Sequence, residues 1–279
     1  MDRGKSVSTR KTKRTDKAPQ RLFQILIADD NVQAKNNTSV LDLNSNSFKS
    51  VYPNAEYRLY GNNDILDLLT KHYSKSVVHA YQDLIPFAFK ADLARYCLLH
   101  TFGGLYSDLS YFHIRPLELK SSCEAVVFRD VPGHPSWAVS NAIIYSNPNN
   151  EFLAKAIARI VENHAKGFYG HSPLEPTGPY MLGRVLAETD NWKTIAFGDS
   201  RLINNGPSNK AEILKIAPSG EVIALRNKSQ SGQISDLVST GGNNYIELWR
   251  SRRIWGETAS RGLIKKIHSK FKKLQSGGN

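Results

Sequence analysis

Residues 90–110, KADLARYCLLHTFGGLYSDLS, decide the fold. Apolar side chains recur at helical spacing in the first part of this stretch and predict a helix over 86–100, which Gly103 and Gly104 end. Two consecutive glycines also permit a tight turn and the close approach of a ligand to the backbone. The short apolar run after them is typical of a strand in an α/β protein.

Three charged side chains of this stretch can converge on one crevice. Asp92 and Arg95 are three residues apart and therefore share a helix face. Asp108 ends the apolar run, and the ends of strands are where α/β folds place ligand-binding groups. A carboxylate there can hold a divalent cation on a diphosphate or accept hydrogen bonds from a sugar hydroxyl. An ordinary helix ion pair followed by a glycine cap explains the same pattern equally well.

Helical and strand patterns alternate on both sides of this stretch, which indicates an α/β fold. Strand patterns occur at 23–28, 55–60, 125–128, 142–145, 212–216 and 222–225. Helix patterns occur at 63–71, 149–164 and 179–187. The chain has no GxxxxGK[ST], GxGxxG, HExxH or GxSxG motif.

The charge of the chain lies at its two ends. Its 279 residues suffice for one or at most two domains, and a hydrophobic content of 40% excludes a wholly disordered chain. Of the formal net charge of +12, residues 1–21 carry +6, residues 250–279 carry +8, and the body between them carries −2. We therefore expect ends that meet an anionic partner and no basic groove through the core.

The two cysteines, Cys97 and Cys123, are too few for a disulfide framework or a zinc site, and they suggest a reducing compartment. No run of about 18 apolar residues occurs, so no membrane span is predicted. Residues 1–20 lack the apolar core of a secretory signal. We therefore expect a cytoplasmic location.

Residues 259–274, ASRGLIKKIHSKFKKL, form an amphipathic pattern if they are helical. Apolar residues recur every three or four positions, and lysines and arginine fill most of the rest. Such a helix can lie on the inner, anionic face of a membrane. It can equally pack its apolar stripe on the main body with its lysines in water. Nucleic acid is the poorer fit, because no base-reading motif is present.

Residues 91–96, ADLARY, and 103–110, GGLYSDLS, resemble the DXD-containing sugar-binding region of glycosyltransferases. This is the family-32-like group that includes fungal outer-chain α-mannosyltransferases and bacterial capsule enzymes, and more remotely the glucosylating toxins. The segment SNAII at 140–144 and the turn TGP at 177–179 agree with the same family in order. The resemblance covers roughly residues 22–190.

The resemblance implies a GT-A-type fold, in which a Rossmann-like sheet with flanking helices holds a nucleotide-diphospho-sugar. It implies a hexosyltransferase that retains the anomeric configuration and passes the sugar to a glycan or lipid-linked acceptor, in the synthesis of a bacterial surface polysaccharide or glycolipid. The implied organisation is a disordered basic arm over 1–21, the transferase domain over 22–255 and a basic amphipathic tail over 256–279.

The resemblance also implies roles for individual residues. Asp92, Arg95 and Asp108 are the predicted catalytic residues. Asn141 is a predicted donor-binding residue as well, although an Asn at a strand is often only a turn residue. The full set of predicted donor-binding residues is Gly103, Gly104, Tyr106, Asp108, Asn141, Thr177, Gly178 and Pro179.

The sequence departs from the family at Ser110, which stands where the second Asp of the DXD is normally found. Asp108 and Ser110 are thus the predicted metal ligands, and a hydroxyl binds Mg²⁺ or Mn²⁺ more weakly than a carboxylate does. Asp108 and the diphosphate could still hold the cation. Basic residues could instead replace its charge on the leaving diphosphate. The chain could also bind a donor without efficient transfer.

A few other residues have weaker signals. Trp249 and Trp255 could close over a diphosphate, but packing against the core is the favoured interpretation. His134 is expected in a loop. Asp29 and Asp30 end the first strand pattern and could lie near the base or ribose of a nucleotide.

Overall fold

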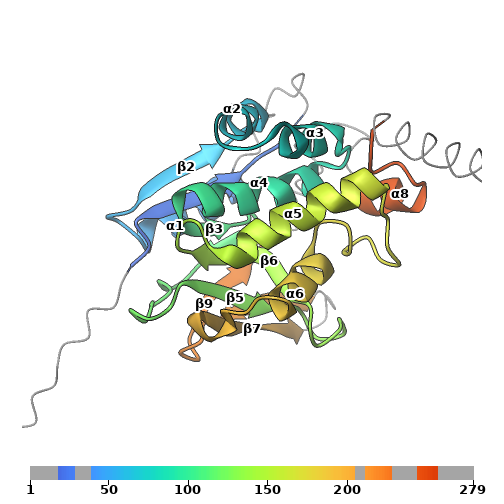
Figure 1. Ribbon diagram of the computed structural model, residues 1–279. Coiled ribbons are helices and arrows are strands. Elements are labelled where there is room, and N and C mark those ends of the chain that lie inside the picture. The colour runs from blue at the N-terminus through green and yellow to red at the C-terminus, as the bar shows by residue number, and fades with distance from the viewer. Residues whose placement is uncertain (1–17, 29–38, 205–210, 228–243, 257–279) are drawn as a thin grey trace, which may run out of the picture.

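A computed structural model describes residues 18–28, 39–204, 211–227 and 244–256. Helices and strands alternate along these residues (Figure 1). The strands are β1 (Arg21–Ile25), β2 (Glu56–Tyr60), β3 (Gly104–Ser107), β4 (Tyr111–His113), β5 (Ala125–Arg129), β6 (Val139–Ser146), β7 (Ile195–Asn204), β8 (Ala211–Ile216) and β9 (Val222–Arg226). The helices are α1 (Ser39–Ser50), α2 (Asn62–His72), α3 (Lys75–Asp83), α4 (Phe87–Phe102), α5 (Glu151–Lys166), α6 (Pro179–Ala187), the 3₁₀ turn η1 (Trp192–Thr194) and α8 (Tyr245–Arg250).

The strands form one mixed sheet in the order β2-β1-β3-β6-β5-β7-β8-β9-β4. Strands β1, β2 and β3 are parallel, as are β5 and β7, whereas β6 runs antiparallel between β3 and β5. Helices connect the parallel strands, as parallel pairing requires.

The sheet curls back on itself. Strand β3 is third in the sheet and β4 is last, yet only residues 108–110 join them. A link of three residues spans roughly 13 Å at most, so the far edge of the sheet must return to β3. The curl therefore places the Asp108 turn where the β4 edge of the sheet returns to β3.

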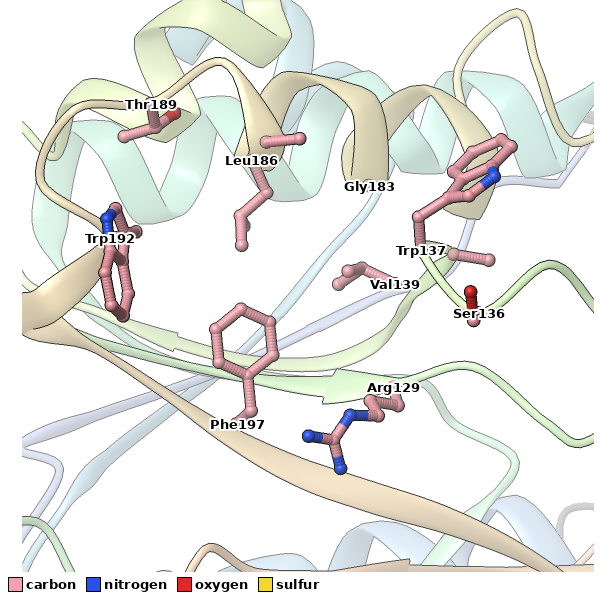
Figure 2. A pocket seen from close by; sticks show the side chains of 11 residues that line it. Arg129, Ser136, Trp137, Val139, Gly183, Leu186, Thr189, Trp192 and Phe197 are labelled. Atoms are coloured by element: carbon pink, nitrogen blue, oxygen red, sulfur yellow. The ribbon is translucent and has the colours of Figure 1, made fainter.

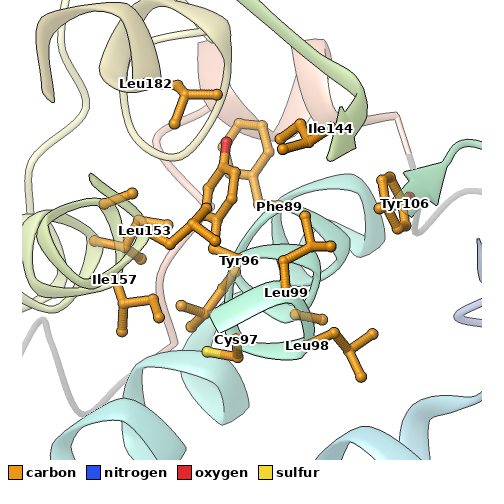
Figure 3. Packing of buried hydrophobic residues seen from close by; sticks show 14 of the residues in the cluster. Phe89, Tyr96, Cys97, Leu98, Leu99, Tyr106, Ile144, Leu153, Ile157 and Leu182 are labelled. Carbon is orange, nitrogen blue, oxygen red and sulfur yellow. The ribbon is translucent and has the colours of Figure 1, made fainter. Parts of the chain in front are cut away.

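Helices α4, α5 and α6 pack on one face of the sheet (Figure 1). Figure 3 shows Tyr96 and Leu99 of α4 packed among side chains of α5 and α6, including Leu153 and Leu182. Nine residues of α4 are buried, more than a single stripe would provide. The helix is therefore enclosed by the sheet and its neighbours, and its charged residues are buried with it.

A second core fills the inside of the curl. Phe48 and Tyr52, at the end of α1 and just after it, pack there with Tyr111 of β4, Phe128 of β5 and Ile143 of β6. This core supports the Asp108 turn from the side opposite α4.

The expected α/β class is confirmed, and each predicted helix and strand is present with small shifts in its ends. Helix α2 begins after Gly61 and α5 after the cap Asn150, close to the predicted starts. The patterns did not predict α1, α3, β4 or β7. Both cysteines are free thiols. Among the described residues, no helix is long and apolar enough to cross a membrane. Residues 1–17 and 257–279, which include most of the predicted arm and tail, lie outside the described residues.

Candidate donor-sugar site

The Asp108 turn is held from both sides. The backbone N–H of Asp108 donates to the carbonyl of Ala142 on β6, at 2.8 Å. The N–H of Asn227, just after β9, donates to the carbonyl of Ser110 at 2.7 Å. The turn is thus fixed between β6 and the residue after β9, as a preorganised site requires.

The structure brings the three predicted catalytic residues together. Arg95 Nη2 lies 3.2 Å from Asp92 Oδ1, and Arg95 Nη1 lies 3.3 Å from Asp108 Oδ1. Asp92 and Arg95 are buried, whereas the Asp108 side chain is 32% exposed. Of the two carboxylates, Asp108 is therefore the one that solvent and a ligand reach more readily.

Two further predicted residues complete the group. Asn141 Nδ2 donates to Asp92 Oδ1 at 2.8 Å, and the Thr177 hydroxyl donates to Asp92 Oδ2 at 2.7 Å. We call Asp92, Arg95, Asp108, Asn141 and Thr177 the Arg95 cluster. Both oxygens of its buried carboxylate are hydrogen-bonded, as burial of a charge requires. Asn141 is therefore part of β6 and of this network, and it is not a turn residue.

The sequence pattern assigned no role in the site to Tyr96. The ring packs in the core, but the hydroxyl donates to the Thr177 carbonyl at 3.1 Å and accepts from Asn141 Nδ2 at the same distance. Its place directly after Arg95 in the segment ADLARY, residues 91–96, was the signal that could have identified it. Tyr96 therefore belongs to the support of the Arg95 cluster.

Burial dominates the electrostatics of the cluster. It raises the pKa of Asp92 to about 6, although Arg95 and the bond from Thr177 act in the opposite direction. Burial also works to lower the pKa of Arg95, but the carboxylates of Asp108 and Asp92 outweigh it, so that the pKa is raised. Arg95 is therefore a permanent cation between the two acids.

Tyr106 of β3 orients Asp108. Its hydroxyl donates to Asp108 Oδ1 at 2.6 Å, and its ring lies 4.7 Å from the Arg95 guanidinium carbon. The burial of Tyr106 raises its pKa well above the usual value, so the hydroxyl keeps its proton and remains a donor. Among the described residues, none donates to Asp108 Oδ2, which leaves this oxygen for a ligand.

The predicted glycines divide into two groups. Gly103 has φ +62°, and a Cβ there would lie 2.5 Å from Pro148 Cδ. Gly104 has φ +130°, and its Cβ would lie 2.6 Å from the Arg21 carbonyl oxygen. These two shape the connection from α4 to β3, at the end of β3 away from Asp108.

By contrast, Gly178 and Pro179 lie at the Arg95 cluster. A Cβ on Gly178 would lie 3.6 Å from Asp92 Oδ2. Pro179 is the first residue of α6, where its fixed φ favours the helix start.

The predicted metal ligands do not form a metal site by themselves. Ser110 offers a hydroxyl, and Asp108 has one oxygen already bound to Tyr106 and Arg95. No group of three His, Cys, Asp or Glu side chains suited to a metal occurs in the part of the chain that the structure describes. Mg²⁺ prefers about six oxygen ligands, so this donor set fits a divalent cation poorly.

A separate pocket of about 310 Å³ lies between α6 and strands β5 to β7. Figure 2 shows Trp137 and Trp192 at opposite ends of it, with Leu186 and Phe197 between them. Its remaining lining residues are Arg129, Ser136, Ala138, Val139, Gly183, Ala187 and Thr189. None of the predicted site residues lines this pocket.

The residues with weaker signals lie elsewhere. Trp249 Nε1 donates to the Tyr169 carbonyl and Trp255 Nε1 to the Phe168 carbonyl, and both side chains pack on the core, as the favoured interpretation predicted. His134 lies between β5 and β6, bonded to Asp130. Residues 29 and 30 lie outside the described residues.

Residues 16–127 match the model of the family described as "Glycosyltransferase sugar-binding region containing DXD motif". This confirms the resemblance found in the sequence, and the matched region contains Asp92, Arg95 and Asp108. The match covers less than half of the chain and identifies residues 16–127 as a glycosyltransferase sugar-binding region. No protein with a curated description matches the sequence.

Several solved structures are similar to this chain, among them the following three. PaToxG glycosyltransferase shares 17% identity at a TM-score of 0.41, over 63% of this chain and 71% of that chain. The UDP-bound glycosyltransferase domain of the YGT toxin shares 12% sequence identity at a TM-score of 0.37, over 57% of this chain and 55% of that chain. The catalytic domain of alpha-toxin from Clostridium novyi shares 12% sequence identity at a TM-score of 0.38, over 63% of this chain and 65% of that chain.

Proposed function

We propose that this chain transfers a sugar from a nucleotide-diphospho-sugar to a glycan or lipid-linked acceptor, with retention of the anomeric configuration. The observation that carries the proposal is Arg95, held between the buried Asp92 and the accessible Asp108 within a glycosyltransferase sugar-binding region. The family match supports the reaction class.

In this proposal Asp108 touches the donor. Arg95 and Tyr106 fix its Oδ1, and Oδ2 accepts a hydrogen bond from a ribose or sugar hydroxyl. Asp92 and Arg95 are buried, so we assign to them the positioning of Asp108 and of the backbone at Gly178.

The other predicted donor-binding residues then have supporting roles. Asn141 and Thr177 hold Asp92. Pro179 sets the start of α6. We assign Gly103 and Gly104 to the shape of the connection between α4 and β3.

Binding of nucleotide sugars tests the proposal directly. We would screen UDP- and GDP-sugars by calorimetry and mass spectrometry, with and without Mn²⁺, and we expect one donor class to bind. Asp108→Ala should weaken that donor at least tenfold. Asp199→Ala is the matched control, because Asp199 is a carboxylate of similar exposure that pairs with Arg129 outside the cluster. The proposal fails if no donor binds, and the site assignment fails if Asp108→Ala binds as well as the wild type.

A second candidate function is donor binding without efficient transfer, which the poor metal ligand set at Ser110 favours. Release of free sugar from the donor by the wild type, absent in Asp92→Ala, would exclude it. A large gain in metal-dependent turnover in Ser110→Asp would support it, since the substitution restores the missing carboxylate.

We further propose a bacterial surface polysaccharide or glycolipid as the product, made by a chain that sits at the membrane surface. The basic amphipathic pattern of residues 259–274 supports this location. Deletion of residues 256–279 should abolish binding to liposomes rich in anionic lipid and leave donor affinity unchanged. Unchanged liposome binding after the deletion would contradict the membrane role and leave the transferase proposal intact.

A further inference from the structure

Lys215 of β8 is buried inside the curled sheet, with 1% of its surface exposed. Its ammonium donates to the hydroxyl of Ser140 on β6 at 2.6 Å and to that of Ser200 on β7 at 2.8 Å. Strand β6 and the later pair β7 and β8 thus meet at one cation.

No acid neutralises this cation directly. Within the described residues, no carboxylate oxygen lies within 4.0 Å of Lys215 Nζ, and its hydrogen-bond partners are neutral hydroxyls. The rings of Tyr111 and Phe128 lie 5.7 and 5.6 Å from Nζ and offer only weak cation–π contact. A buried ammonium without an ion pair destabilises a fold, so its presence calls for a reason beyond packing.

The ammonium lies close behind the Asp108 turn. Tyr111, whose ring faces Nζ, is the residue directly after the turn 108–110. Ser140 is the residue directly before Asn141 of the Arg95 cluster. Burial lowers the pKa of Lys215, and the charges of Asp130 and Asp108 act in the opposite direction.

We propose that Lys215 supplies the positive charge that stabilises the donor diphosphate next to Asp108, where Ser110 has replaced a carboxylate that would hold a cation. This inference rests on the proposed function. In the transfer, the bond between sugar C1 and the β-phosphate oxygen breaks and a bond between C1 and the acceptor oxygen forms. The acceptor hydroxyl proton passes to water, and the leaving diphosphate gains one negative charge. A preorganised cation in a water-poor site is suited to that developing charge.

Affinity as a function of phosphate number tests this role. We would measure uridine, UMP and UDP, and the matching guanosine series, by calorimetry in EDTA for the wild type and Lys215→Met. The expected loss in Lys215→Met is absent for the nucleoside and reaches tenfold or more for the diphosphate. Lys90→Met is the control, because Lys90 is a partly buried lysine whose ammonium also has neutral partners, the Tyr81 and Gln82 carbonyls. It should leave all affinities unchanged.

A second variant separates charge from packing. Lys215→Gln keeps a hydrogen-bond donor for the two serines but lacks the charge, and it should show the same dependence on phosphate number. Equal losses for nucleoside and diphosphate, or no loss, would overturn the inference while wild-type diphosphate binding upholds the proposed function. A wild type that binds the diphosphate only when Mn²⁺ is added would overturn the inference alone, and one that binds no nucleotide with or without Mn²⁺ would overturn both.

Discussion

Arg95 Nη1 lies 3.3 Å from Asp108 Oδ1, which joins the middle of a buried helix to the turn where the sheet closes. The same guanidinium donates to the Asn141 carbonyl at 2.5 Å and through Nε to the Ala91 carbonyl at 3.1 Å. Arg95 is thus bonded to α4, to β6 and to the Asp108 turn. The geometry of the Arg95 cluster therefore depends on one planar cation.

Replacement of Arg95 should be among the most destabilising substitutions in the chain. Arg95→Met leaves Asp92 buried without its cation, and we expect a loss of about 3–5 kcal/mol in the free energy of unfolding. Arg95→Lys keeps the charge but not the fork of donors, so it should recover only part of the loss. Urea denaturation of both variants measures this. A Met variant as stable as the wild type would show that Asp92 is neutral in the folded protein.

The Thr177 hydroxyl should contribute strongly to the stability of the folded protein. Thr177→Val keeps the shape but removes the donor to Asp92 Oδ2, which costs about 1–3 kcal/mol for a buried acceptor. Thr177→Ser restores the donor and should regain most of the stability. Thermal denaturation compares the two variants. Equal stability of Val and Ser would mean that this hydrogen bond contributes nothing.

Asp92 should make stability depend on pH. Burial raises its pKa from 3.8 to about 6, so the folded state holds a proton between these values that the unfolded state has lost. The free energy of unfolding should therefore fall as pH rises from about 4 to about 6, by at most about 3 kcal/mol from this group. Asp92→Asn should lack that fall, and the difference between the two proteins in urea titrations from pH 4 to 7 isolates it. A difference of opposite sign would mean that the ion pair with Arg95 outweighs burial.

Gly103 should be required for folding and not for donor contact. Gly103→Ala places a Cβ 2.5 Å from Pro148 at a φ of +62° and should cost more than about 2 kcal/mol. Gly133→Ala is the control, since Gly133 also has a positive φ but has open space around it. Thermal denaturation with nucleotide titration of the folded fraction checks both effects. A stable Gly103→Ala variant that fails to bind nucleotide would contradict this. It would support the prediction from the sequence that a ligand closely approaches the backbone at the two glycines.

Lys215 should destabilise the fold at neutral pH. Burial lowers its pKa from 10.5 to about 8, so between these values the unfolded state binds the proton and the folded state does not. The free energy of unfolding of the wild type should therefore rise with pH from 8 to 10.5, relative to Lys215→Met. At pH 7 the Met variant should be more stable by about 1–3 kcal/mol. A less stable Met variant would show that the bonds to Ser140 and Ser200 outweigh the burial of charge.

Local patterns predicted the helices and strands that carry strong periodicity. Helix α6 begins at Pro179, as predicted, because the fixed φ of proline favours the first position of a helix. This preference depends on the residue itself and can be read from the sequence. Helix α1 lacked a clear apolar stripe and was not predicted, because its burial comes from the inside of the curled sheet. Strand β4 is three residues long, too short for a periodic signal.

The sequence by itself determined that Asp92 and Arg95 share a helix face and that Asp108 follows a glycine pair, because these relations lie within about twenty residues. Only the tertiary structure decided which residues complete the site. Thr177 reaches Asp92 across 85 residues, and Lys215 reaches Ser140 across 75. Such contacts depend on the order of strands in the sheet and on its curl, which follow from the packing of two cores and have no local signature in the chain.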